Sequence, residues 1–310
     1  MTSEAKSPAP AVRAAWAFQS ERGSRFMLQL MTWISLRLGR RVGRVILYLI
    51  AAYFTLFSPC ATAASRDYLR RVLDRAPQRR DVFRHILTFA STIHDRVYLI
   101  NDQFQAFDIK IIGDAGIRRV ENQGQGCIII GAHLGSFDII RALGDHRQAS
   151  RVAMLMYEDN ARKINSMLAA INPGKQQDII ALGRIDSILQ VRDRLDHGAV
   201  VGVLADRGLD DDATVMVTFL GQPAAFPIGP FRMAAMLACP VVFMAGIYIG
   251  GNRYEIHFED VVDFSQTAPA ERGVAINSAL TRYVALIEQH CRAHPYNWFN
   301  FYDFWRVRAS

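Results

Sequence analysis

The sequence feature that most restricts the possible fold of this chain is a short apolar run, residues 127–131, that ends at a glycine. It reads Cys-Ile-Ile-Ile-Gly, with no alternation of polar and apolar side chains. A strand of this kind is usually covered on both faces, as in a mostly parallel sheet between helices. Apolar positions resume at helical spacing from Ile139 to Leu143, so the stretch predicts a buried strand, a tight turn and a helix.

Short apolar runs alternate with amphipathic segments throughout the chain beyond residue 105, without an internal repeat or a low-complexity linker. This alternation is the pattern of an α/β sheet. The expected strands are 109–112, 127–130, 152–156, 179–182, 199–204, 215–219, 241–247 and 254–258, and the expected helices are 137–143, 160–171, 186–196, 229–237 and 270–292. We therefore expect an α/β fold with a mixed, largely parallel sheet flanked by helices.

The turn after residue 131 carries two candidate catalytic residues, His133 and Asp138. His133 follows the strand at its carboxyl end, where open α/β sheets bind their ligands. On one continuous helix the two side chains would point about 140° apart, so they can meet only if His133 precedes the helix. In that geometry Asp138 would accept the Nδ1 proton of His133 and leave Nε2 free as a base. A histidine near a carboxylate is by itself more often structural than catalytic.

Positive charge is concentrated in the N-terminal third. Residues 1–100 hold 16 Lys and Arg against 6 Asp and Glu, whereas the remaining residues hold 20 against 23. No nucleic-acid-binding motif accompanies these arginines, so nucleic acid is not an expected partner. Basic charge beside apolar segments indicates an anionic membrane surface instead.

The sequence divides into three parts. Residues 1–24 lack periodicity and predict a disordered tail. Residues 25–65 are strongly apolar, without any charge from Val45 to Ser65, and predict membrane-associated helices. Their apolar run is shorter than the roughly 20 residues of a transmembrane helix, so a marginal span, two interfacial helices and buried core helices all stay open. Residues 66–310 form the expected α/β domain, which begins with basic helical segments up to residue 97.

The four cysteines and eight histidines show neither disulfide spacing nor metal-ligand spacing. Cys127 and Cys239 lie inside apolar runs, which indicates buried and reduced thiols. We expect no disulfide framework and no metal.

Three further places carry weaker signals. Asp206 and Arg207 follow an apolar strand and would lie at the same sheet edge as His133, either as functional groups or as a structural ion pair. A turn at Gly221 leads to a helix that begins at Gly229 and could hold an anion at its N-terminus, although turn chemistry alone explains it as well. Arg232, early in that helix, is a candidate for binding phosphate.

The aromatic C-terminal segment, which includes Trp298, Tyr302 and Trp305, most simply packs the end of the chain onto the sheet. An acyl tunnel wall or a membrane-interface belt is the alternative interpretation.

Four sequence blocks in this order resemble the lysophospholipid and lipid A type acyltransferase superfamily. They are GAHLGSFD at 131–138, with its H-x4-D pattern, VLADRG at 203–208, TFLGQPAAFPIGP at 218–230 and CPVVF at 239–243. The chain has Phe137-Asp138 where lipid A enzymes usually have Trp-Glu, and Asp206-Arg207 where they have Asp-Gln. Its aromatic ending looks like the branch found beside bacterial aryl polyene and related lipid pathways.

The resemblance implies an enzyme at the cytoplasmic face of the bacterial inner membrane, with residues 66–310 as the acyltransferase domain. It would move a fatty acyl chain from an acyl carrier protein or coenzyme A thioester to a hydroxyl of a membrane lipid or glycolipid, with no cofactor besides that co-substrate. His133 would act as general base, oriented by Asp138. The substrate-binding residues would be Gly135, Ser136, Asp206, Arg207, Gly221, Pro223, Gly229 and Arg232.

Two other functions stay open at this point. A thioester hydrolase of the same fold would use water in place of the lipid acceptor. A non-enzymatic scaffold would bind anionic membranes through the basic N-terminal third and would leave the matching blocks unexplained.

Overall fold

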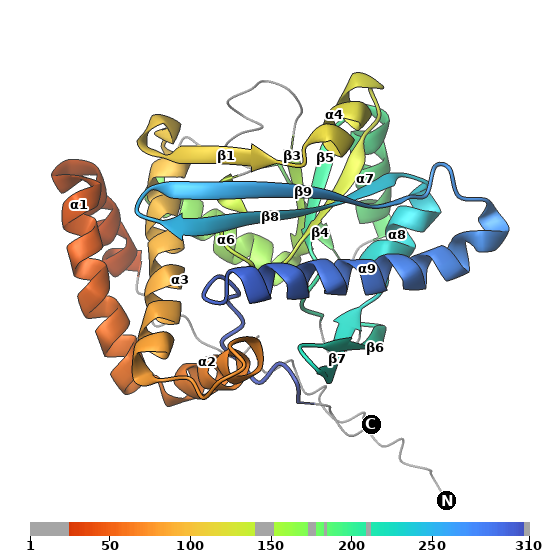
Figure 1. The fold of residues 1–310 in the computed structure, drawn as a ribbon. Coiled ribbons are helices and arrows are strands. Elements are labelled where there is room, and N and C mark those ends of the chain that lie inside the picture. The colour runs from red at the N-terminus through yellow and green to blue at the C-terminus, as the bar shows by residue number, and fades with distance from the viewer. Residues whose placement is uncertain (1–24, 140–151, 173–177, 183–184, 209–211, 307–310) are drawn as a thin grey trace, which may run out of the picture.

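The computed structural model describes residues 25–139, 152–172, 178–182, 185–208 and 212–306. Its centre is a seven-stranded sheet with the order β1-β9-β8-β2-β5-β3-β4 (Figure 1). The strands are β1 Asp108–Ile112, β2 Cys127–Gly131, β3 Val152–Tyr157, β4 Ile179–Leu182, β5 Val200–Leu204, β8 Pro240–Gly250 and β9 Arg253–Asp263. Among the described strands of this sheet, β8 and β9 pair antiparallel and every other neighbouring pair is parallel.

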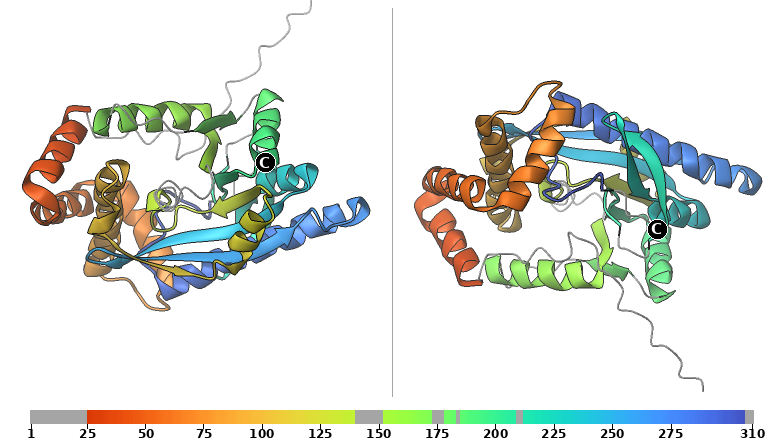
Figure 2. Two further views of the ribbon diagram at one scale, coloured as in Figure 1. Left: turned by 90° about the horizontal axis from the view of Figure 1, so that it is seen from above. Right: turned by 90° about the horizontal axis from the view of Figure 1, so that it is seen from below.

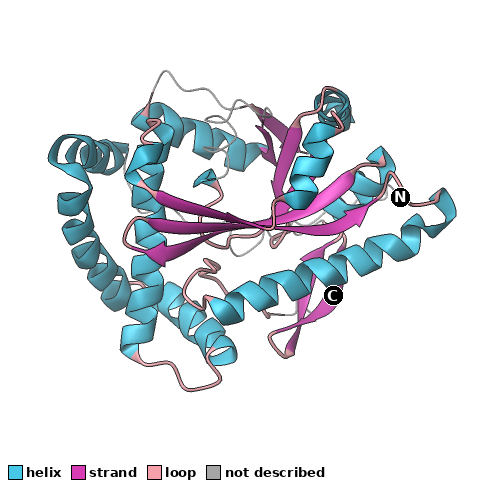
Figure 3. Cartoon of the chain, turned by 45° about the horizontal axis from the view of Figure 1, so that its top comes forward, coloured by secondary structure: helices cyan, strands magenta, loops and turns pink. Residues whose placement is uncertain are grey.

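Helices cover both faces of this sheet, as Figure 3 shows. They are α4 Ala115–Asn122, α6 Glu158–Ile171, α7 Ile185–Asp196, α8 Gly229–Leu237 and α9 Arg272–Ala293. In β2, Ile128 and Ile130 belong to a core that includes residues of α7, α8 and α9, whereas Cys127 and Ile129 belong to a second core with residues of α4 and α6. All five residues of β2 are buried, as expected for an unbroken apolar strand between two helical layers.

The predicted α/β class is therefore confirmed. Each expected strand is present, with ends that differ by a few residues, and the expected helices beyond residue 152 are present as well. The expected helix 137–143 begins at Asp138, and its part beyond residue 139 lies outside the described residues, as does the expected tail 1–24.

One α-helix and one strand of the described residues were not predicted. Helix α4 has only two buried large side chains, Ile117 and Val120, too few to give a clear apolar period. Strand β7 Gln222–Pro227 pairs antiparallel with β6 Thr214–Phe219 in a separate two-stranded sheet. Its prolines at both ends argue against a strand, but Pro at an unpaired edge is compatible with one. The turn between them contains Leu220 and Gly221, both with positive φ, as the type I′ turn of a two-residue hairpin requires.

The N-terminal part consists of three helices, α1 Arg25–Phe57, α2 Pro59–Val72 and α3 Arg79–Ile100. Helix α1 is kinked at Gly39, whose φ of 82° and ψ of 167° are not helical. Figure 2 shows that α1 begins beside α6 and then runs along α3. Within the described residues, no single helix is long and apolar enough to cross a membrane; the bent pair Thr32–Phe57 and Pro59–Val72, at 93°, meets those criteria only together.

Candidate active site

The site lies where two neighbouring parallel strands end. Gly131 of β2 pairs with Leu204 of β5, and each strand is followed two residues later by a polar side chain, His133 and Asp206 respectively. The Nδ1 atom of His133 lies 2.8 Å from Oδ1 of Asp206. The backbone N–H of His133 also donates to Oδ2 of the same carboxylate, at 3.0 Å. Register and chain direction therefore bring together two residues that are 73 positions apart.

Asp206 is a buried carboxylate with a full set of donors. Besides the two bonds from His133, its Oδ2 accepts hydrogen bonds from Asn300 Nδ2 at 2.8 Å and Trp298 Nε1 at 3.3 Å. Burial alone would raise the pKa of Asp206, but the charges and hydrogen bonds of His133, Arg207 and Asn300 outweigh burial and hold that pKa well below its usual 3.8. The carboxylate is therefore ionised near pH 7.

The ionised Asp206 fixes which ring nitrogen of His133 carries the proton. Nδ1 of His133 must carry the proton in the bond to Asp206, so Nε2 is the atom with the free lone pair. The side chain is 30% exposed, which leaves the ring accessible. Burial, helped by the positive charge of Arg207, lowers the pKa of His133 below the usual 6.5, and Asp206 offsets only part of this effect. The ring is therefore neutral near pH 7, the form that can accept a proton.

The predicted contact between Asp138 and His133 Nδ1 is wrong, because Asp206 takes that position. Asp138 lies at the start of the helix after the turn and pairs with Arg96 of α3, with 2.6 Å between Oδ2 and Nε. The charge of Arg96 is one of those that lower the pKa of His133, so Asp138 neutralises a cation close to the imidazole. Asp138 is the carboxylate nearest to His133 along the chain, whereas Asp206, which contacts Nδ1, follows the neighbouring strand β5. Sequence proximity therefore predicted the wrong partner.

The loop that carries His133 is held on both sides by backbone hydrogen bonds. The N–H of Gly135 donates to Asn297 O and the N–H of Ser136 donates to Gly246 O, both at 2.7 Å. Gly135 has a φ of +68°, and a Cβ there would overlap the carbonyl oxygen of Gly246 in β8. Because their N–H groups are already used, Gly135 and Ser136 shape the loop; their predicted substrate contacts would have to come from other atoms.

The C-terminal segment 297–300 forms the other wall of the site. The N–H of Phe299 donates to His133 O at 2.7 Å, and Trp298 pairs with Leu134 as an isolated antiparallel bridge. Trp298 is fully buried, with ring centroids 5.0 Å from Tyr68 and 5.2 Å from Phe219. The packing interpretation of the C-terminal aromatics therefore holds for Trp298, which also donates to Asp206.

Arg207 also ties this segment to β5. Its Nε donates to Asn300 Oδ1 at 2.5 Å and its Nη2 donates to Phe299 O at 2.9 Å. Its guanidinium carbon lies 5.4 Å from the centroid of the Tyr302 ring. Asn300 thus bonds Asp206 through its amide nitrogen and Arg207 through its amide oxygen. The sequence signal for this role is a polar amide, Asn300, within an aromatic run, and the sequence analysis did not single it out.

The remaining predicted substrate residues lie elsewhere in the fold. Gly221 and Pro223 belong to the β6–β7 hairpin, and Gly229 and the exposed Arg232 begin α8. Among the described residues, no hydrogen bond or ion pair connects any of these four to His133 or Asp206, so their contact with substrate stays a prediction. The described part of the chain also contains no group of three or more His, Cys, Asp or Glu side chains that could hold a metal ion.

Comparison with models of known protein families shows to which family the chain belongs. Residues 20–307 match the model of the bacterial lipid A biosynthesis acyltransferases. The chain belongs to this family. Family membership makes the protein an acyltransferase of lipid A-like biosynthesis and confirms the resemblance to the acyltransferase superfamily. A search of curated proteins finds no match to the chain.

Proposed function

We propose that this acyltransferase moves a fatty acyl chain from an acyl carrier protein or coenzyme A thioester to a hydroxyl of a membrane lipid or glycolipid at the cytoplasmic face of the inner membrane. The observation that carries the proposal is the 2.8 Å contact between His133 Nδ1 and Asp206, which leaves Nε2 of a neutral imidazole as base. The thioester is the only co-substrate required, and no other cofactor is proposed.

The reaction follows from this geometry. Nε2 of His133 takes the proton of the acceptor hydroxyl while its oxygen attacks the thioester carbonyl carbon. The tetrahedral intermediate collapses with cleavage of the carbon–sulfur bond, and the leaving thiolate receives the proton from the imidazolium. Asp206 stays ionised and stabilises the imidazolium through Nδ1. Asp138, predicted as a catalytic residue, is assigned here to neutralising Arg96 beside the imidazole.

The test is acyl transfer by purified protein from a radiolabelled acyl carrier protein or coenzyme A thioester to extracted bacterial lipid. His133→Gln should reduce the rate of transfer by about 10² to 10⁴, the usual contribution of a general base, with an unchanged melting temperature. Unchanged transfer would remove His133 as the base. Release of free fatty acid at full rate without lipid would instead identify a thioester hydrolase.

A further inference from the structure

Strand β8 extends beyond its neighbour β2 at the edge of the sheet where the site is built. Pairing between the two strands ends where Ile130 lies opposite Phe243, whereas β8 continues to Gly250 and stays paired with β9 on its other side. Residues 244–248 of β8 are buried. Buried backbone N–H and C=O groups are nearly always hydrogen-bonded, so the groups in this stretch that point away from β9 need partners other than β2.

The catalytic loop and the C-terminal segment supply these partners. The carbonyl oxygen of Gly246 accepts a hydrogen bond from the N–H of Ser136 at 2.7 Å, and Gly135 forms a parallel bridge with Gly246. Further along β8, the N–H of Tyr248 donates to Oδ1 of Asn297 at 2.9 Å, and the carbonyl oxygen of Tyr248 accepts from Nδ2 of Asn297 at 3.1 Å. The loop and the segment are therefore aligned on the same free edge of β8.

Asn297 connects the loop, the segment and the strand. Its side chain bonds the backbone of Tyr248, and its own carbonyl oxygen accepts from the N–H of Gly135 at 2.7 Å. Two residues later, the N–H of Phe299 donates to the carbonyl oxygen of His133. Asn297 is only 5% exposed, so its amide is out of contact with water and depends on the two bonds to Tyr248. The place of His133 relative to β8 thus depends on this amide.

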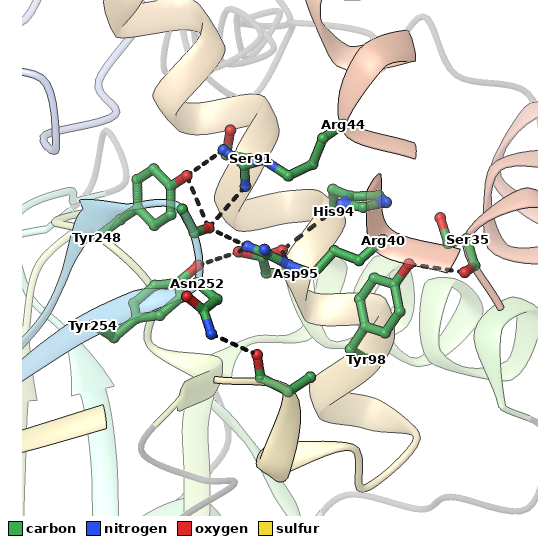
Figure 4. Close-up of polar contacts among 12 residues, drawn as sticks. Ser35, Arg40, Arg44, Ser91, His94, Asp95, Tyr98, Tyr248, Asn252 and Tyr254 are labelled. Carbon is green, nitrogen blue, oxygen red and sulfur yellow. Dashed lines mark hydrogen bonds and ion pairs between the residues drawn. The ribbon is translucent and has the colours of Figure 1, made fainter. Parts of the chain in front are cut away.

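The end of β8 is in turn attached to α1. Nη2 of Arg44 donates to the hydroxyl of Tyr248, and this hydroxyl donates to the carbonyl oxygen of Gly251 at 3.3 Å. Gly251, in the turn between β8 and β9, also accepts from Nη1 of Arg44 at 3.1 Å and from Arg40. Figure 4 shows both arginines reaching from α1 toward α3 and the β8–β9 hairpin.

The attachment of α1 rests on a second, buried contact. Nε and Nη2 of Arg40 each lie 2.8 Å from a carboxylate oxygen of Asp95 in α3, and the hydroxyl of Tyr254 donates to the same carboxylate at 2.9 Å. Tyr254 of β9 pairs directly with Tyr248 of β8. Hydrogen bonds between ionised groups are stronger than those between neutral groups. The turn of the β8–β9 hairpin is therefore fixed to both α1 and α3.

We propose that Asn297 and Arg44 are positioning residues for His133. Asn297 aligns the catalytic loop on the free edge of β8, and Arg44 fixes the end of β8 to which Asn297 is bonded. Both act through other residues, and position matters because a misplacement of about 1 Å can lower a rate by about 10². The effect on rate rests on the proposed function, whereas the effect on the loop is measured without substrate.

The first test is amide hydrogen exchange of the full chain without substrate, measured by mass spectrometry. Asn297→Ala removes both bonds to Tyr248 and should accelerate exchange in peptides that cover residues 133–136 by about tenfold or more. Arg44→Gln should accelerate the same peptides by a smaller factor, because it acts through β8. Peptides of β5 should exchange as in wild type.

The Arg44 variant keeps this test decisive if Asn297→Ala accelerates exchange throughout the chain. Its contacts lie at the end of the hairpin, so the core should stay intact. Unchanged exchange at residues 133–136 in either variant would overturn the proposal.

The second test measures kcat and KM for acyl transfer. Arg44→Gln should lower kcat by up to about tenfold with little change in KM, because the loop and not the substrate is displaced. Tyr248→Phe removes the same hydrogen bond, so the double variant should lose no more than Arg44→Gln alone. Arg44→Lys keeps a charged donor and should recover part of the loss. The matched control, Arg41→Gln, removes an exposed charge of the same helix and should leave kcat unchanged.

Additive losses in the double variant, or an equal loss in Arg41→Gln, would overturn the role of Arg44. A change confined to KM would do the same, since it would indicate contact with substrate. Failure of the proposed function has a different signature: the unaltered protein would transfer no acyl group, while the exchange results would remain as predicted.

Discussion

At the scale of single residues, the site depends on which carboxylate contacts His133 and which contacts Arg96. Asp206 is bound to His133 and buried, whereas Asp138 is bound to Arg96. The two carboxylates therefore act on the same imidazole in different ways. Asp206 fixes its tautomer through a direct hydrogen bond, and Asp138 screens a neighbouring positive charge.

This difference predicts a specific pH effect for Asp138→Asn. The charge of Arg96 already lowers the pKa of His133, and without its carboxylate that charge should lower it further. Protonated His133 is inactive as a base, so the acid limb of the pH–rate profile should move to lower pH while kcat at pH 7.5 stays within about tenfold of wild type. Arg96→Gln is the matched opposite change and should move the acid limb to higher pH. A shift in the same direction for both variants would contradict this assignment.

A second buried histidine predicts how stability depends on pH. His85 of α3 has Nδ1 2.8 Å from Ser65 Oγ and Nε2 2.8 Å from Trp298 O, and burial lowers its pKa from 6.5 to about 4. Between these values the unfolded chain binds a proton that the folded protein does not, so stability falls as pH decreases from 6.5 to 4. The loss reaches about 3 kcal/mol. Urea unfolding at several pH values measures it, and His85→Gln should remove this part of the pH dependence.

At the scale of elements, the catalytic loop has little backbone freedom because β8 lies on one side and the C-terminal segment on the other. Gly135→Ala should destabilise the protein by more than the roughly 1 kcal/mol of a strained φ, because a Cβ there also overlaps Gly246 O. Gly221→Ala is the control: its φ is +78° but nothing lies within 4 Å of the added atom. In thermal unfolding, the melting temperature of Gly135→Ala should be well below that of Gly221→Ala. Equal melting temperatures would show that the loop can move away from β8.

The C-terminal segment makes a separate prediction through Asn300. Asn300→Ala removes one donor from buried Asp206 and the acceptor of Arg207 Nε, which should lower the free energy of unfolding by about 1 to 3 kcal/mol. It should also reduce kcat, with less effect on KM. The reason is that Asn300 positions Asp206, which orients the base His133, and is not expected to contact the substrate. A change confined to KM would show that Asn300 contacts substrate.

At the scale of the whole molecule, the sequence predicted the sheet well and the site only partly. Period and apolar runs are local signals, so strands such as β2 and β4 and helix α8 were predicted nearly to their ends. The partner of His133 depends on β2 lying beside β5, and no local pattern contains that information. The same holds for Asn300 and for the contact between Arg40 and Asp95, which joins residues 55 positions apart. Strand order decides the active site, and strand order is a tertiary property.

The most direct measurement of the central claim compares acyl transfer by Asp206→Asn and Asp138→Asn, each with its folding established by circular dichroism. An amide at Asp206 can donate to Nδ1 and so favours the wrong tautomer of His133, which typically lowers kcat by about 10⁴ in a comparable arrangement. We predict a loss of that order for Asp206→Asn and at most about a tenfold loss for Asp138→Asn at pH 7.5. Near-normal transfer by Asp206→Asn, together with none by Asp138→Asn, would contradict the assignment of Asp206 as the residue that orients the base.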